Sequence, residues 1–105
     1  MKSQKQRAQE KREKKKQDKE TMWEVFREIW NERPHYSEVS WTKLGKEILS
    51  TYFHHILPKA RYEEAKFDKD NIILLTQDEH TMVERDETKY EEINKRRAKL
   101  KEKYG

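Results

Sequence analysis

The sequence contains no cysteine and little apolar material: of its 105 residues, 31% are hydrophobic and 44% are charged. Without cysteine, the chain forms neither disulfides nor a cysteine-ligated zinc site. No apolar run approaches the roughly 20 residues that span a bilayer, and the N-terminus lacks the apolar segment of a secretory signal. We therefore expect one small soluble domain in the cytoplasm, without membrane partners and with a compact region well below full length.

Glycine and proline are also scarce, at two residues each. Pro34 disfavours helix at the residue before it, which predicts that a helix ends by Arg33. Pro58 is expected to end a strand, because proline interrupts the hydrogen bonding of a sheet. Gly45 predicts a turn, which we place in a short hairpin over residues 41–45.

Positive charge is concentrated near the N-terminus. Residues 1–19 carry nine Lys or Arg and three Asp or Glu, a net charge of +6, whereas the remainder carries a net charge of −2. After Met1, residues 2–20 hold a single apolar side chain, Ala8, among many good helix formers. We expect residues 1–20 to be a basic arm, either disordered or helical, in which case it extends the helix that follows into one long basic N-terminal helix. Such an arm attracts polyanions by releasing their counterions; the alternative is a solvated tail without a partner.

The rest of the chain alternates between helix and strand patterns. Residues 21–33 are expected to be helical, and Thr21 with Glu24 forms a capping-box pattern at the start. The β-branched and aromatic run 50–56 predicts a strand, and the apolar run 71–75 predicts a buried strand. The polar loop 57–70 lies between them. The helix expected over residues 21–33 has one apolar face at helical spacing, formed by Met22, Trp23, Val25, Phe26, Ile29 and Trp30.

A further helix begins near Thr76, where Thr-Gln-Asp-Glu is a second capping box. The polar residues 85–88 are expected to interrupt it, and a final helix covers about residues 88–103. The fold class is therefore α+β. Residues 1–20 form the arm, and residues 21–105 form the domain, with a core over 34–84.

Histidine and asparagine residues occupy the junctions of these elements. His54 and His55 lie in the first strand, Asn71 follows sixteen residues after His55, and His80 follows nine residues after Asn71. Neutral imidazole binds metal ions, and its ordinary pKa suits a general base. A metal beside such a base stabilises charge on a phosphate during hydrolysis. His35 has no partner at ligand spacing and is expected to be exposed or locally bonded.

Residues 33–84 resemble the HNH, or ββα-metal, endonucleases. The resemblance rests on the run His54-His55-Ile56-Leu57-Pro58, on Asn71 followed by apolar residues, and on the position of His80. It implies a ββα-metal core in which His55 is the general base and His54 and His80 bind the metal. Asn71 would position the base and its loop. The resemblance also implies one divalent ion (magnesium, or manganese, nickel or zinc in its place) and hydrolysis that leaves a 5′ phosphate and a 3′ hydroxyl.

The adjacent histidines raise a geometric difficulty, because neighbouring residues in a regular strand point to opposite faces. His54 and His55 serve one phosphate only where the backbone is irregular or where the phosphate lies at the strand end, near Pro58. Glu84 lies four residues after His80, on the same helix face. It is either an additional ligand or a solvated glutamate.

Many members of this family brace the core with a structural zinc held by two Cys-x-x-Cys pairs. Here those places are taken by residues 37–40, Ser-Glu-Val-Ser, and residues 76–79, Thr-Gln-Asp-Glu. Hydroxyl groups are not among the usual zinc ligands, so the sequence predicts no structural zinc. The capping box of Thr76 and Glu79 is expected to fix the helix start instead, worth about 1 kcal/mol, and the helix at 22–30 to supply the missing packing.

The resemblance implies duplex DNA as the substrate, nicked or cleaved with low sequence specificity. Its small single-module form is similar to phage-encoded members, which implies that the protein acts in the host cytoplasm. A partner in packaging or recombination is left open, and so is the choice between a monomer and a homodimer. Phosphate contacts position a protein on DNA without specifying sequence. The candidate contacts are Lys59, Arg61, Lys66 and Lys69 in the loop, with Lys11, Arg12, Lys14, Lys15 and Lys16 in the arm.

Two other classes of protein compete with this interpretation. A non-catalytic DNA-binding protein that retains the HNH fold has no need of the histidines. A charged helical interaction protein leaves the spacing of Asn71 and His80 unexplained. Metal-dependent cleavage separates the endonuclease from both, and salt-dependent DNA binding separates the other two from each other.

Overall fold

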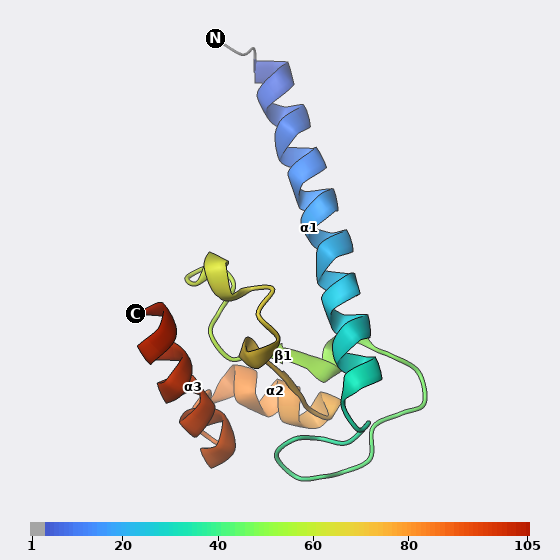
Figure 1. Cartoon of the computed structure of the whole chain (residues 1–105), viewed down its shortest axis with the longest axis vertical. Helices are drawn as coiled ribbons and strands as arrows, with labels where there is room; N and C mark the ends of the chain where they lie inside the picture. Colours follow the sequence, from blue (N-terminus) through green and yellow to red (C-terminus); the bar gives the residue numbers. More distant parts are fainter. Residues whose placement is uncertain (1–3) are drawn as a thin grey trace.

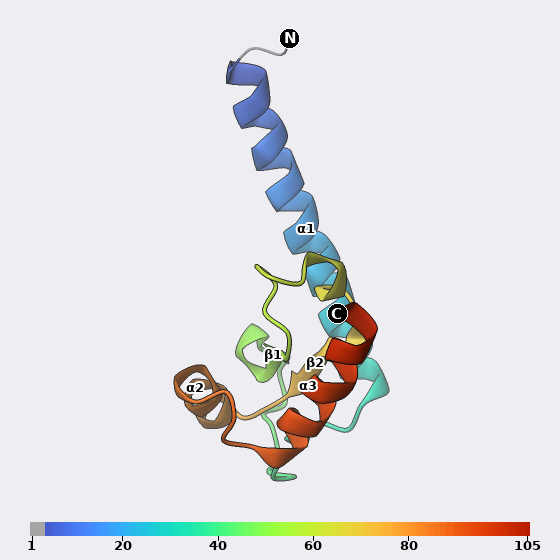
Figure 2. The same cartoon turned by 90° about the vertical axis from the view of Figure 1, so that its left-hand side faces the viewer.

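The computed structural model describes residues 4–105, with side-chain environments from Lys14 onward. Within this range it contains three α-helices and one two-stranded antiparallel sheet, so the fold is a small mixed α/β arrangement. The elements are α1 (Gln4–Glu32), β1 (Phe53–His55), β2 (Ile72–Leu74), α2 (Gln77–Arg85) and α3 (Glu91–Tyr104). Figure 1 shows the N-terminal half of α1 extending away from all the other elements, and Figure 2 shows the same from the side.

Helix α1 is continuous, so the capping role considered for Thr21 is wrong, whereas the helical alternative for the basic arm is confirmed over residues 4–20. The Thr21 hydroxyl donates a hydrogen bond to the Gln17 carbonyl at 3.0 Å, as a residue inside a helix does, and caps nothing. The reason is that the arm contains good helix formers and no proline or glycine, while the apolar C-terminal half is held by tertiary packing and overcomes the cost of nucleation. The helix ends at Glu32, just before Arg33 and Pro34, as predicted.

The sheet lies between two apolar clusters, because successive residues of each strand point to opposite faces. Phe53 of β1 and Leu74 of β2 pair directly and face α1, where they pack with Ile29. On the opposite face, Ile73 packs with Val83 of α2 and with residues of α3. The first cluster is completed by Phe26, Trp30, Leu44, Tyr52 and Ile72, and the second by Ile56, Leu57, Ala65, Leu75, Ile93 and Leu100.

The strands are shorter than the sequence predicts, because their flanks form single helical turns. Residues Ser50–Tyr52 and Lys69–Asn71 are 3₁₀ turns that lead into β1 and β2. A third turn, Glu63–Ala65, gives structure to the long loop between the strands. The final helix begins at Glu91, a few residues later than predicted, because residues 86–90 form a turn after α2.

The segment between α1 and β1 makes a turn at a different place from the predicted 41–45 hairpin. Tyr36 and Lys43 form an isolated antiparallel bridge, and the left-handed backbone conformation falls on Trp41, with φ of 60°. Gly45 is needed for space instead: a Cβ there would lie 2.7 Å from the Tyr52 hydroxyl. The Trp41 side chain is 68% exposed.

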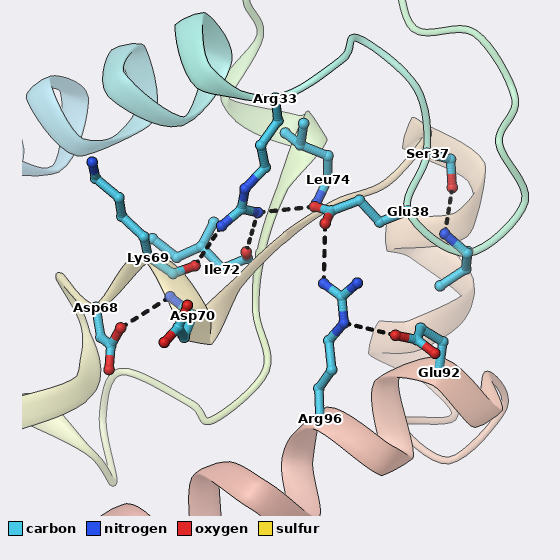
Figure 3. Close-up of polar contacts among 11 residues, drawn as sticks. Arg33, Ser37, Glu38, Asp68, Lys69, Asp70, Ile72, Leu74, Glu92 and Arg96 are labelled. Atoms are coloured by element: carbon cyan, nitrogen blue, oxygen red, sulfur yellow. Dashed lines mark hydrogen bonds and ion pairs between the residues drawn. The ribbon is translucent and has the colours of Figure 1, made fainter.

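A polar network joins α1, β2 and α3 (Figure 3). The Arg33 guanidinium donates to the Ile72 carbonyl at 2.7 Å and the Lys69 carbonyl at 2.8 Å, and pairs with Glu38 at 2.9 Å. Glu38 accepts a hydrogen bond from the Leu74 amide at 2.7 Å and pairs with Arg96 of α3 at 3.1 Å. The network therefore holds α3 beside β2. Among the described residues, no helix is long and apolar enough to cross a bilayer.

Candidate active site

His54 and His80 face each other from β1 and α2. Their ring centroids are 5.0 Å apart, with the planes at 71°. The Thr51 carbonyl accepts a hydrogen bond from Nδ1 of His80 at 2.7 Å, which fixes the proton on that nitrogen when the ring is neutral. Nε2 of His80 is then a free acceptor, and it lies 3.5 Å from a Glu84 carboxylate oxygen.

His54 is held in its neutral form. Its pKa is lowered to about 4, mainly by burial and in addition by the neighbouring His80, His55 and Arg97. At neutral pH the His54 imidazole is therefore uncharged, and one of its ring nitrogens carries a lone pair. A neutral imidazole is the form that binds a metal ion.

His55 is oriented by the loop between the strands. Its Nε2 lies 2.9 Å from the Lys66 carbonyl, and because a carbonyl only accepts, Nε2 carries the proton and Nδ1 is the basic nitrogen. Burial lowers the pKa of His55, the bond to Lys66 opposes this, and the charges of Lys59 and His80 add to the lowering. His55 is therefore a neutral imidazole with one fixed tautomer, which is the state a general base requires.

The two adjacent histidines leave β1 toward opposite layers, as the alternation of a strand requires. His54 pairs with Ile73, whose side chain faces α2 and α3, whereas His55 pairs with Ile72, whose side chain faces α1. His55 accordingly has its ring centroid 6.3 Å from that of Phe26. Both histidines nevertheless line one pocket of about 350 Å³ at the end of the strand, beside Pro58. The strand-end alternative of the sequence analysis is the one that the geometry supports.

Asn71 fixes the loop that orients His55. Its side chain is fully buried, so it is a positioning residue and does not reach a substrate. Its Oδ1 accepts from the Leu57 amide at 2.7 Å, and its Nδ2 donates to the carbonyls of Leu57 at 3.1 Å and Ala65 at 3.2 Å. The amide group therefore ties both ends of the segment 57–65 to the start of β2.

The donor atoms fit a divalent ion held by two protein ligands. Within the described residues, no group of three or more His, Cys, Asp or Glu has the arrangement of a complete metal site. His54 and His80 are two convergent imidazoles, and the bond from His80 to the Thr51 carbonyl is the outer hydrogen bond that metal-binding histidines usually make. Two imidazole nitrogens suit manganese, nickel or zinc better than magnesium, which prefers oxygen. Water and substrate oxygens would complete the coordination.

The four polar residues at the positions that the resemblance compares with zinc-binding cysteines, Ser37, Ser40, Thr76 and Glu79, come together in the structure. Thr76 caps α2 by accepting from the Glu79 amide at 3.1 Å, and the Glu79 carboxylate accepts from the Thr76 amide at 2.8 Å, which confirms the predicted capping box. Burial pushes the pKa of Glu79 upward, but hydrogen bonds from Ser37, Ser40 and Thr76 outweigh it, and the pKa is lowered. The Ser37 hydroxyl is fully buried and also accepts from the amides of Val39 and Ser40, both at 3.2 Å. A hydrogen-bonded cluster thus joins the two segments.

Two of the lysines predicted to contact DNA form ion pairs with carboxylates of α1 in the described structure. Lys66 pairs with Asp18 of α1 at 2.9 Å, and Lys69 pairs with Glu28 at 2.9 Å and Glu32 at 2.8 Å. These ion pairs attach the loop between the strands to α1, because that helix carries carboxylates on the side that faces the loop. No local pattern in the sequence indicates the pairing. A phosphate would have to displace these partners to contact Lys66 or Lys69, whose contacts with DNA stay a prediction.

The other basic candidates remain accessible. Lys59 and Arg61 are exposed in the loop, and Lys15 and Lys16 are exposed on α1. Lys14 is 70% exposed, although its Nζ lies 3.6 Å from Glu63. The side chains of Lys11 and Arg12 lie outside the described residues.

Arg97 of α3 lines the histidine pocket, and the sequence analysis missed it. It falls outside the segment that resembles a family, in a run of charged residues that is typical of a solvated helix face. His35 is locally bonded, as expected: its ring stacks on Trp30 with centroids 3.7 Å apart, and its Nε2 lies 2.8 Å from the Trp30 carbonyl.

No family model matches the chain, and no curated protein or solved structure matches it.

Proposed function

We propose that this protein is a metal-dependent DNA endonuclease of the HNH type. The observation that carries the proposal is the arrangement of His55. Its Nε2–H is held by the Lys66 carbonyl, its Nδ1 is free to accept a proton, and it shares a pocket with His54, whose ring lies 5.0 Å from that of His80. The sequence resemblance over residues 33–84 supplies the reaction class.

In this function, His55 takes a proton from a water molecule at Nδ1 as the water attacks the phosphorus of a phosphodiester. The imidazolium that forms keeps its Nε2–H bond to the Lys66 carbonyl, so its orientation does not change during the transfer. His54 and His80 would hold the divalent ion, which would stabilise negative charge on the phosphate and on the 3′ leaving oxygen until that oxygen takes a proton from solvent. The resemblance predicts that the products carry a 5′ phosphate and a 3′ hydroxyl.

DNA binding in this proposal depends on the exposed basic side chains around the pocket and on α1. Lys59 lies close enough to His55 to affect its pKa, and it is a phosphate contact beside the reacting centre. Lys14, Lys15 and Lys16 lie on α1, whose N-terminal half projects clear of the domain (Figure 1). Contacts of this kind bind the backbone without reading bases, which fits low sequence specificity.

The experiment is the cleavage of supercoiled plasmid by the purified full chain, first with EDTA and then with magnesium, manganese, nickel or zinc. We expect metal-dependent nicking or linearisation that His55→Ala lowers by roughly 10² to 10⁴-fold, the usual contribution of a general base. His35→Ala is the matched control, because it also removes an imidazole bonded to a backbone carbonyl but lies outside the pocket. Circular dichroism of both variants checks that they fold.

A chain that binds the plasmid but cleaves it with none of these metals would contradict the endonuclease. The projecting basic half of α1 would then favour the second candidate, a non-catalytic DNA-binding protein with the HNH fold. Equal cleavage by wild type and His55→Ala would contradict the role of His55.

A further inference from the structure

Arg97 has a buried hydrogen-bond donor without a partner. Its Nη1 donates to the Asn94 side chain at 2.8 Å, and its Nη2 donates to the Glu87 carbonyl at 2.7 Å. These two bonds hold the guanidinium plane in place. The Nε–H is buried and, among the described side chains, it is the one buried side-chain polar atom with no acceptor. A buried donor normally has a partner, and an exception calls for a physical explanation.

Arg97 differs from the other partly buried arginines Arg33 and Arg96 in its charge environment. Arg33 and Arg96 each form an ion pair with Glu38, at 2.9 Å and 3.1 Å. For Arg97, no carboxylate among residues 14–105 lies within ion-pairing distance, and its protein acceptors are an amide oxygen and a carbonyl. A partly buried guanidinium without an anion is costly, so an anion that bonds to Arg97 gains an attractive interaction, which has to exceed repulsion from Glu84 and Glu87 in the same pocket.

The position of Arg97 ties this donor to the histidines. Arg97 lines the same pocket of about 350 Å³ as His54, His55 and Pro58. Its charge also reaches His54, where it adds to the effects of burial and His80 in lowering the pKa. The cation comes from α3, whereas the histidines come from β1, so two separate elements of the fold converge on one cavity.

We propose that Arg97 binds the phosphodiester attacked by the water that His55 deprotonates, with its Nε–H donating to a non-bridging phosphate oxygen. This inference rests on the proposed function and adds a phosphate-binding residue from outside the segment that resembles the HNH family. Guanidinium groups suit phosphate because they present fixed N–H donors, stay charged at all relevant pH values and are weakly hydrated. The bonds to Asn94 and Glu87 hold this donor in place before the substrate arrives.

The first experiment uses metal-free full chain in EDTA and dimethyl phosphate, a singly charged diester, as the probe. The Nε–H signal of Arg97 in a ¹H–¹⁵N spectrum, assigned by its loss in Arg97→Lys, is expected to shift and saturate as the diester is added. Sodium chloride at the same ionic strength should leave it in place. A signal that does not respond to the diester would overturn the inference, whatever the protein does to DNA.

The second experiment measures the affinity of a short DNA duplex in EDTA by fluorescence anisotropy. Arg97→Gln is expected to weaken the Kd by about tenfold, the loss of one charge-assisted hydrogen bond, and to reduce the salt slope by about 1. Arg97→Lys, which keeps the charge but loses the planar donors, should fall between. The matched control is Lys101→Gln, an exposed cation on the same helix, and it should lose less affinity than Arg97→Gln.

The outcomes separate this inference from the endonuclease itself. If Arg97→Gln and Lys101→Gln bind DNA equally well and both stay folded by circular dichroism, the proposed role of Arg97 is wrong. The endonuclease proposal is then tested by plasmid cleavage alone. If dimethyl phosphate shifts the Arg97 signal but no metal supports cleavage, the phosphate site stands and the hydrolysis does not.

Discussion

The Tyr52 side chain joins the segment before β1 to the main apolar cluster. Its ring lies parallel to that of Trp30, with centroids 5.9 Å apart, and the residue is only 9% exposed. Its hydroxyl accepts a hydrogen bond from the Gly45 amide at 3.0 Å. A packed ring cannot swing aside, so the space above Gly45 is fixed by Tyr52.

This contact predicts a strong coupling between the two residues. Gly45→Ala should destabilise the protein by about 1–3 kcal/mol, the usual cost of overpacking, because the new Cβ would lie 2.7 Å from the Tyr52 hydroxyl. In a Tyr52→Phe background the nearest ring atom is 3.8 Å away, an ordinary contact, and the same substitution should cost much less. Urea unfolding of the double-mutant cycle measures the coupling, and additive costs would show that the hydroxyl is not the obstacle.

At the scale of single residues, the spacing in the sequence predicted that the three histidines and Asn71 lie at element junctions, because the order of the elements follows from local patterns. His54, His55 and His80 do share one region, and Asn71 does hold the loop. The position of Arg97 depends on how α3 packs, and that packing comes from long-range contacts with no local pattern. The left-handed conformation of Trp41 was missed for a similar reason, since glycine is the residue that local preference places there.

At the scale of elements, the capping box of α2 makes a quantitative prediction. Thr76→Ala should lower the free energy of unfolding by about 1 kcal/mol, because the Glu79 amide loses the hydroxyl that it donates to at 3.1 Å. Thr81→Ala is the control: its hydroxyl donates to the Gln77 carbonyl inside the helix, where alanine is the better helix former. Thermal unfolding of both variants tests this, and equal changes would mean that the cap contributes nothing.

The sequence predicted the types of the elements better than their limits. The helix after Thr76 begins where the capping box indicates, because a cap is a local interaction that adjacent residues determine. The length of α1 and the shortness of β1 are set by tertiary contacts. In α1 the packing of Ile29 and Trp30 on the sheet stabilises a helix that continues back to Gln4, and around β1 the flanking residues turn before the strand pattern ends.

At the scale of the whole molecule, Asp68 connects the loop between the strands to the end of the chain. Its carboxylate accepts hydrogen bonds from Lys103 at 2.7 Å and from the Tyr104 hydroxyl, both at the C-terminal end of α3. Burial raises the pKa of Asp68, but the bonds from Lys103, Tyr104 and the Asp70 amide outweigh burial, and the pKa is lowered. The ionised form is therefore the one that stabilises the fold.

A lowered carboxyl pKa gives stability that is present above the ordinary value, about 3.9, and is lost as the pH falls through the folded-state pKa. Asp68→Asn should thus be less stable than the wild type near neutral pH, and the difference should shrink below about pH 4. Urea unfolding over a pH series measures it, with Asp70→Asn, an exposed neighbour, as the control. A difference that stays constant down to low pH would contradict the role of the Asp68 charge.

Arg33 and Glu38 also determine whether two copies of this chain can associate through the outer edge of β2. An outer strand normally presents a row of unpaired amides and carbonyls, and these recruit further strands in aggregation. Along β2 the row is already occupied, by Arg33 at the Ile72 carbonyl and by the carboxylate and amide of Glu38 at Leu74. A second molecule therefore finds no free backbone groups along the outer edge of β2, so this edge of the sheet does not recruit a further strand.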